Sequence, residues 1–90
     1  MCKDMTLLEV DHNMLGELVN EIGQCVSLTK LDASYNHLQA LPSSMGRLTN
    51  LTSLMLIENP IKSLPPDLKR LTNIVELRVK ITELNGVRNT

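Results

Sequence analysis

The chain repeats its own pattern every 23 residues. The segment LTKLDASYNHLQALPSSMGRLTN at 28–50 is followed directly by LTSLMLIENPIKSLPPDLKRLTN at 51–73. The same frame covers 5–27 and, as an incomplete unit, 74–90. Self-similarity at a fixed period is the signature of a stacked array, in which each unit buries its apolar face against the next. We therefore expect a single repeat array over residues 1–90, with three full repeats and part of a fourth.

The first half of each repeat has the pattern of a short strand. Apolar residues occupy repeat positions 4 and 6, and residues two apart share one face of a strand. These pairs are Leu8 and Val10, Leu31 and Ala33, Leu54 and Leu56, and Leu77 and Val79. Each repeat is therefore predicted to begin with a strand whose positions 4 and 6 face inward.

Repeat position 9, directly after the strand, is asparagine in Asn13, Asn36 and Asn59. An asparagine amide can both donate and accept hydrogen bonds, so stacked side chains can satisfy backbone groups in a turn that no strand ladder reaches. The fourth unit has Thr82 in this place. We expect a structural asparagine ladder that weakens at Thr82.

The second half of each repeat has the spacing of a short helical turn. Apolar residues stand three and four positions apart, as one buried helical face requires. Pro42 and Pro65 precede this segment in the second and third repeats, where proline favours a helix start, and Val19 stands in that place in the first. The spacing predicts a short helical or 3₁₀ segment on the side away from the strand.

The complete pattern, LxxLxLxxNxLxxLPxxLxxLxx, resembles the leucine-rich repeat family in its 23-residue intracellular form. It is similar to the repeats of the Scribble and erbin group and of the Ras-pathway scaffold. The resemblance implies an α/β fold: a right-handed solenoid with a short parallel sheet on its concave face. Short helical or 3₁₀ turns would then form the convex face.

Composition excludes several function classes. The net charge is −1 and the Lys and Arg residues are scattered, so no basic footprint for nucleic acid or an anionic membrane is present. No apolar run approaches the roughly 18 residues of a membrane span, and the first residues lack a signal-peptide pattern. We expect neither a nucleic-acid partner nor a membrane span.

The two cysteines do not make the disulfide framework of a small secreted domain. Cys25 stands where the next repeats have Leu48 and Leu71, so it is predicted to be a buried free thiol that acts as a small hydrophobe. This interpretation favours a reducing, cytoplasmic location.

No constellation of residues points to catalysis, a cofactor or a metal. His12 and His37 come from different positions of successive repeats, and Cys25 is expected to point into the coil, away from them. The chain is therefore predicted to be no enzyme and to hold no cofactor.

The variable strand positions carry the functional information, because positions 3, 5 and 7 are predicted to point outward and position 8 to lie at the sheet edge. Read along the stack, this surface is acidic, then apolar, then basic. The acidic residues are Glu9, Asp11 and Asp32, the apolar ones Tyr35, Met55 and Ile57, and the basic ones Arg78 and Lys80. An apolar centre with a charged rim is typical of protein interfaces. The competing interpretation is that Met55 and Ile57 are β-favouring residues on a sheet face that binds no partner.

We therefore expect a protein-interaction module that binds a protein partner through the concave sheet, as a scaffold or signalling adaptor. The alternative is a substrate-recognition fragment of a larger enzyme, such as a ubiquitin ligase, phosphatase complex or kinase. A solenoid also exposes its core at ends that lack capping repeats, and no cap is evident in the pattern. Two expectations follow and stay open: the chain is a slice of a longer array, or it self-associates through an uncapped end.

Overall fold

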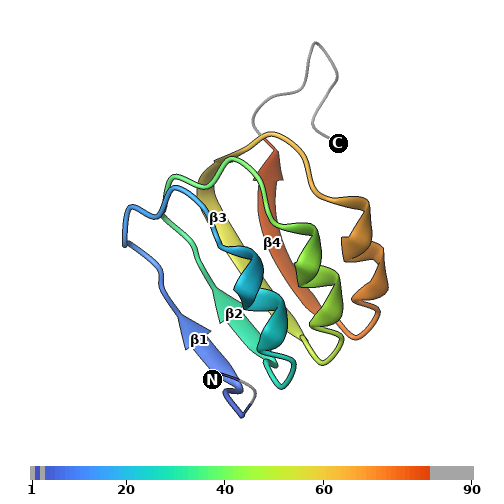
Figure 1. Ribbon diagram of the computed structural model, residues 1–90. Helices are drawn as coiled ribbons and strands as arrows, with labels where there is room; N and C mark the ends of the chain where they lie inside the picture. Colours follow the sequence, from blue (N-terminus) through green and yellow to red (C-terminus); the bar gives the residue numbers. More distant parts are fainter. Residues whose placement is uncertain (1, 3, 82–90) are drawn as a thin grey trace.

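The computed structural model describes residue 2 and residues 4–81, and shows two layers, a parallel sheet and a row of 3₁₀ turns (Figure 1). The sheet has the order β1-β2-β3-β4. Its strands are β1 (Leu7–Glu9), β2 (Lys30–Asp32), β3 (Ser53–Ile61) and β4 (Glu76–Ile81). The predicted fold class is confirmed: each repeat begins with a strand, and each of the first three continues into a turn that packs behind the sheet.

The 3₁₀ turns are η1 (Asn20–Gln24), η2 (Ser43–Arg47) and η3 (Pro66–Arg70). Pro42 and Pro65 stand directly before η2 and η3 and have an extended backbone conformation, with φ −70° and −66°. Val19 adopts a similar conformation before η1, with φ −77° and ψ 159°. The first repeat therefore forms the same turn without proline, because the buried face of Ile22 and Cys25 supplies the packing.

Strand pairing places each residue beside the residue of the same repeat position in the next unit. Leu8 pairs with Leu31, Leu31 with Leu54, and Leu54 with Leu77. Since side chains on a strand alternate between faces, this register stacks the inward leucines in one column. The outward residues are stacked in the same way on the other face.

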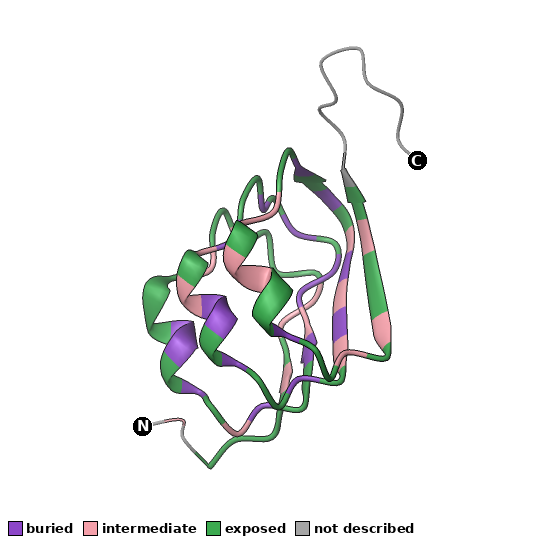
Figure 2. Ribbon diagram, turned by 90° about the vertical axis from the view of Figure 1, so that its right-hand side faces the viewer, coloured by how far each residue is buried: buried purple, intermediate pink, exposed green. Residues whose placement is uncertain are grey.

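The core lies between the sheet and the 3₁₀ turns (Figure 2). Its fully buried large side chains come from the constant repeat positions. They are Leu28, Leu31, Leu38, Met45, Leu48, Leu51, Leu54, Leu56 and Ile61. Burial of an aliphatic side chain contributes about 1.5–3 kcal/mol, so this column is the main source of stability in a chain with one aromatic residue.

Asn36 and Asn59 are buried and bridge successive repeats. Asn36 Oδ1 accepts hydrogen bonds from the backbone N–H groups of Asn13 and Leu15, at 2.9 and 2.8 Å. Asn59 Oδ1 accepts from the N–H groups of Asn36 and Leu38, at 3.2 and 3.1 Å. Both Nδ2 groups donate to carbonyls of their own and the preceding repeat. The predicted ladder exists at these two positions.

The prediction is wrong for the side chain of Asn13. Asn13 is exposed, and within the described part of the chain only its backbone N–H joins the ladder. In the ladder, each side-chain oxygen accepts hydrogen bonds from N–H groups of the preceding repeat. For Asn13, the structure describes no preceding repeat that could supply them. Thr82, where the ladder was expected to weaken, lies outside the described residues.

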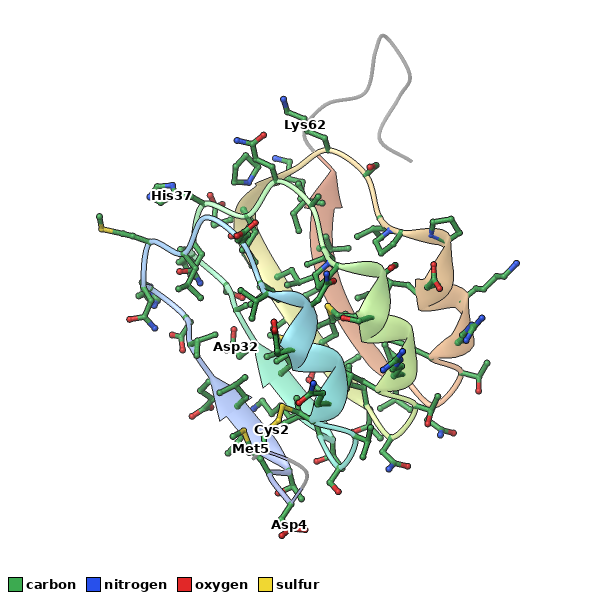
Figure 3. The ribbon with its side chains drawn as sticks, in the orientation of Figure 1. Cys2, Asp4, Met5, Asp32, His37 and Lys62 are labelled. Carbon is green, nitrogen blue, oxygen red and sulfur yellow. A yellow bond between two sulfur atoms is a disulfide. The ribbon has the colours of Figure 1, made fainter. Side chains whose placement is uncertain are left out.

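The prediction that Cys25 is a free thiol is also wrong, because Cys25 forms a disulfide with Cys2 (Figure 3). The two residues are 23 apart, so Cys2 occupies the repeat position of Cys25 one unit earlier. Stacking brings their Cα atoms to 4.9 Å, within the usual range for a disulfide. Cys25 is nonetheless buried among the core residues, as its leucine-equivalent position predicts.

Two glycines allow neighbouring 3₁₀ turns to pack closely. A Cβ atom at Gly23 would lie 2.7 Å from Ser44, and one at Gly46 would lie 2.8 Å from the backbone oxygen of Asp67. Both glycines hold the same position in their repeats, against the following turn. By contrast, a Cβ atom at Gly16 would meet nothing within 4 Å.

Replacing Asn59 with alanine is expected to lower the free energy of unfolding by about 2–4 kcal/mol, because two buried N–H groups lose their acceptor. The matched control, Asn13→Ala, is expected to change it by less than about 0.5 kcal/mol. Urea denaturation of both variants measures the difference. Equal effects at the two positions would contradict the ladder.

Gly46→Ala is expected to destabilise the chain by about 1–3 kcal/mol, since the added methyl group overlaps the backbone of η3. Gly16→Ala serves as the control and is expected to be neutral. Thermal unfolding followed by circular dichroism compares them, and an unaffected Gly46→Ala variant would refute the close approach of η2 and η3.

Candidate protein-binding site

The candidate site is the sheet face turned away from the 3₁₀ turns, which we call the concave face. It is formed by repeat positions 3, 5, 7 and 8, which the strand alternation assigns to the side of the sheet away from the leucine column, with Ser34 as an exception. The described residues of these positions are Leu7, Glu9, Asp11 and His12; Lys30, Asp32, Ser34 and Tyr35; Ser53, Met55, Ile57 and Glu58; and Glu76, Arg78 and Lys80.

The apolar centre of the concave face lies on β3. Met55 and Ile57 are half-buried and alternate with the fully buried Leu54 and Leu56. The Ile57 carbonyl accepts a 2.7 Å hydrogen bond from the backbone N–H of Tyr35. This bond places Tyr35 directly beside Ile57, so the three predicted apolar residues form one neighbourhood.

Tyr35 is 47% exposed, and its ring stacks on His12 with a centroid separation of 4.4 Å and an interplanar angle of 9°. The two residues share repeat position 8, and a stack of about 4.4 Å follows from the spacing of roughly 4.8 Å between adjacent strands. Both have a left-handed backbone, as has Glu58, with φ between 58° and 61°. This conformation is unfavourable for residues other than glycine, and it recurs at position 8 of the first three repeats.

The acidic end is formed by Glu9 on β1 and Asp32 on β2, with Asp11 two residues beyond the end of β1. Asp32 Oδ1 accepts a hydrogen bond from the N–H of Ser34, and Figure 3 marks Asp32 on β2. Asp11 Oδ2 lies 2.9 Å from His12 Nδ1. This hydrogen bond lowers the pKa of Asp11 below its ordinary value of 3.8. Asp11 is therefore an anion throughout the neutral range.

The basic end is formed by Arg78 and Lys80 on β4, both exposed. Arg78 Nε donates to Glu76 Oε2 at 3.2 Å, and Glu76 Oε1 accepts from Ser53 Oγ at 3.4 Å. These contacts hold the Arg78 side chain over the face while its remaining guanidinium N–H groups stay available.

The charge order differs between the rows of the face. Positions 5 and 7 run from acidic on β1 to basic on β4, as the sequence predicts. Position 3 runs the other way, from Lys30 on β2 to Glu76 on β4. Ser34 also departs from the expected outward direction, because it is buried and its Oγ accepts a hydrogen bond from the Ile57 N–H. The polarised surface is therefore restricted to the half of the sheet near the strand ends.

Among the described residues, four hollows have walls that include none of Tyr35, Met55 and Ile57. One of the four has Glu58 and Lys80 of the concave face in its walls. Small-molecule sites are concave and mostly apolar, so an apolar centre outside these hollows fits a macromolecular partner better.

Comparison with known proteins agrees with this architecture. Residues 27–48 match the Leucine Rich Repeat family. A leucine-rich repeat protein of Leptospira interrogans has a solved structure that superposes with a TM-score of 0.82 at 37% sequence identity. The fold is that of a leucine-rich repeat solenoid. The match covers 83% of this chain and 19% of that structure, so the chain spans about a fifth of its length. No curated protein matches the chain in sequence.

The leucine-rich repeat scaffold accounts for where the candidate residues lie, and the structure shows no group of three metal-binding side chains among residues 2 and 4–81. It also shows, for the same residues, no helix long and apolar enough to cross a membrane.

The roles of Ser34 and Glu76 were not predicted from the sequence. Serine at a strand position carries no signal for burial, whereas Glu76 two residues before Arg78 on one strand face could have indicated the ion pair.

His12→Ala is expected to raise the pKa of Asp11 towards its ordinary value, since the variant loses the hydrogen bond that favours the carboxylate. In the folded wild type, this bond contributes stability above the ordinary pKa and loses it as the pH falls through the lowered value. The stability difference between the two proteins should therefore be present at neutral pH and disappear as the pH falls through the acid range. Carboxyl NMR titration measures the shift, and an unchanged Asp11 would contradict the assigned cause.

Proposed function

We propose that this leucine-rich repeat chain is a protein-interaction module that binds a partner through its concave face. The observation that carries the proposal is the apolar centre of exposed Tyr35 and half-buried Met55 and Ile57, which lies between an acidic and a basic end. The sheet face that packs against the 3₁₀ turns needs apolar side chains for stability, but the concave face has no such need. Apolar residues there expose surface that binding would bury.

The centre has the chemistry of an interface core. Tyrosine and methionine are enriched at such cores, and their energetic weight comes from removal of water around them. Tyr35 is already held by the stack on His12 and by its bond to Ile57. An ordered anchor loses less side-chain entropy when it binds, so more of its contact energy appears as affinity.

A scaffold or signalling role is the finer form of this proposal, and it rests on the resemblance to intracellular repeats. The Scribble and erbin subgroup and the cytoplasmic location stay predictions. The disulfide argues against the reducing setting on which that location was based, because disulfides persist mainly in oxidising compartments. The alternative, a recognition segment of a larger enzyme, stays a prediction too.

Self-association is a second proposed interaction. Leu77 occupies an inward repeat position on β4 yet is 49% exposed, and Val75 beside this strand is 87% exposed. An apolar hollow opens next to them, and its walls include Leu68 and Ile74. A second copy that covered this hollow would remove the apolar side chains from water.

Simultaneous replacement of Tyr35, Met55 and Ile57 with alanine is expected to weaken partner binding at least about tenfold, since each truncated anchor loses buried contact area. Affinity purification with the chain as bait, followed by titration of the recovered protein, measures the loss. The control carries alanine at the convex, exposed residues Arg47, Lys69 and Arg70.

The convex variant is expected to retain the affinity of the wild type, and both variants are compared by thermal unfolding to show that they fold. Wild-type affinity in the concave variant would contradict the proposed site. Loss of binding in the convex variant alone would place the interface on the other side of the solenoid.

A further inference from the structure

We propose that the concave face selects an extended peptide segment of its partner by charge order: a basic, an apolar and an acidic side chain at alternate residues. The inference rests on the proposed function and adds to it the chemistry of the partner. It comes from positions 5 and 7, where Glu9 and Asp32 lie on one side of Met55 and Ile57, and Arg78 and Lys80 on the other.

The spacing of the charges matches an extended chain that crosses the strands. Adjacent strands lie about 4.8 Å apart, so β1 and β4 are separated by about 14 Å. An extended peptide rises about 3.3 Å per residue, and residues i, i+2 and i+4 point to one side. Residue i+4 is thus about 13 Å from residue i. If residue i lies between Glu9 and Asp32, Met55 on β3 is about 7 Å away and Arg78 on β4 about 12 Å away, so three alternate side chains reach the acidic end, Met55 and the basic end.

Carboxylate oxygens at the acidic end can still accept hydrogen bonds, because some of them have no partner among the described residues. Asp32 Oδ1 accepts from the Ser34 N–H, which leaves Oδ2 without a hydrogen bond among the described residues. No hydrogen bond or ion pair of the Glu9 side chain occurs among them either. A lysine or arginine side chain placed between Glu9 and Asp32 can donate to both carboxylates.

The basic end is built to receive a carboxylate. Glu76 binds Arg78 through Nε alone, so the two terminal guanidinium nitrogens can form a paired hydrogen bond with a carboxylate. Lys80, two residues further along the same face, has no ion pair among the described residues. Glu76 and Ser53 act as positioning residues that hold Arg78 in place.

A library of short random peptides displayed on phage tests the inference. The wild type is panned beside two folded variants with uniform ends: R78E/K80E, acidic at both ends, and E9K/D11K/D32K, basic at both ends. Uniform ends are used because a peptide could meet a simple charge swap by reversing its direction. Circular dichroism confirms that the variants fold.

We expect the wild type to enrich peptides with opposite charges two residues to either side of an apolar residue. The doubly acidic variant should enrich basic residues at both places, and the doubly basic variant acidic residues. A peptide selected on the wild type should bind each variant at least about tenfold more weakly, because one of its charges meets a like charge.

Two results would overturn the inference. Peptides that bind through Tyr35, Met55 and Ile57 but show no charge order, or the same order on all three proteins, would leave the proposed interface intact and remove the charge selection. Absence of any enriched peptide, together with a protein partner that the concave alanine variant fails to bind, would show a folded surface rather than an extended segment as the ligand.

Discussion

The hydrogen bonds of Asn36 and Asn59 to the backbone of the preceding repeat are the constraint on which the structure depends. The chain must turn sharply after each strand, and the turn leaves N–H groups that the parallel sheet cannot pair. Each buried amide accepts from two of them. Because an unsatisfied buried N–H is costly, this bridge stabilises the stacking of the first three units at the spacing of a sheet.

Fixed stacking turns each repeat position into a column, and the columns divide into two kinds. The inward columns are uniformly apolar and form the core. The outward columns vary from unit to unit, so their side chains can change without loss of the fold. Regular stacking is what brings Glu9, Met55 and Arg78 into one row, although they are widely separated in sequence. The proposed binding surface is a product of the period rather than of any local motif.

Much of the fold could be predicted because the 23-residue period determines it. The strand register, the inward leucines, the 3₁₀ turns and the buried Asn36 and Asn59 all follow from repeat position. The Cys2–Cys25 disulfide was accessible to the same logic, since the two residues are one period apart, but Cys2 stands outside the first full repeat. The burial of Ser34 and the close contact at Gly46 were not accessible. Both depend on the local backbone conformation at a single residue, which the hydrophobic pattern of the sequence does not encode.

Methyl NMR of the chain with a bound partner or selected peptide tests the central claim most directly, because methionine and isoleucine methyls report from both sides of the solenoid. The account predicts large shifts at Met55 and Ile57, with Met45 and Ile22 in the core unchanged. Shifts confined to Ile22 and Met45 would place the ligand against the convex turns. Shifts at Ile74 alone would place it at the end of the array, and either result would contradict binding by the concave face.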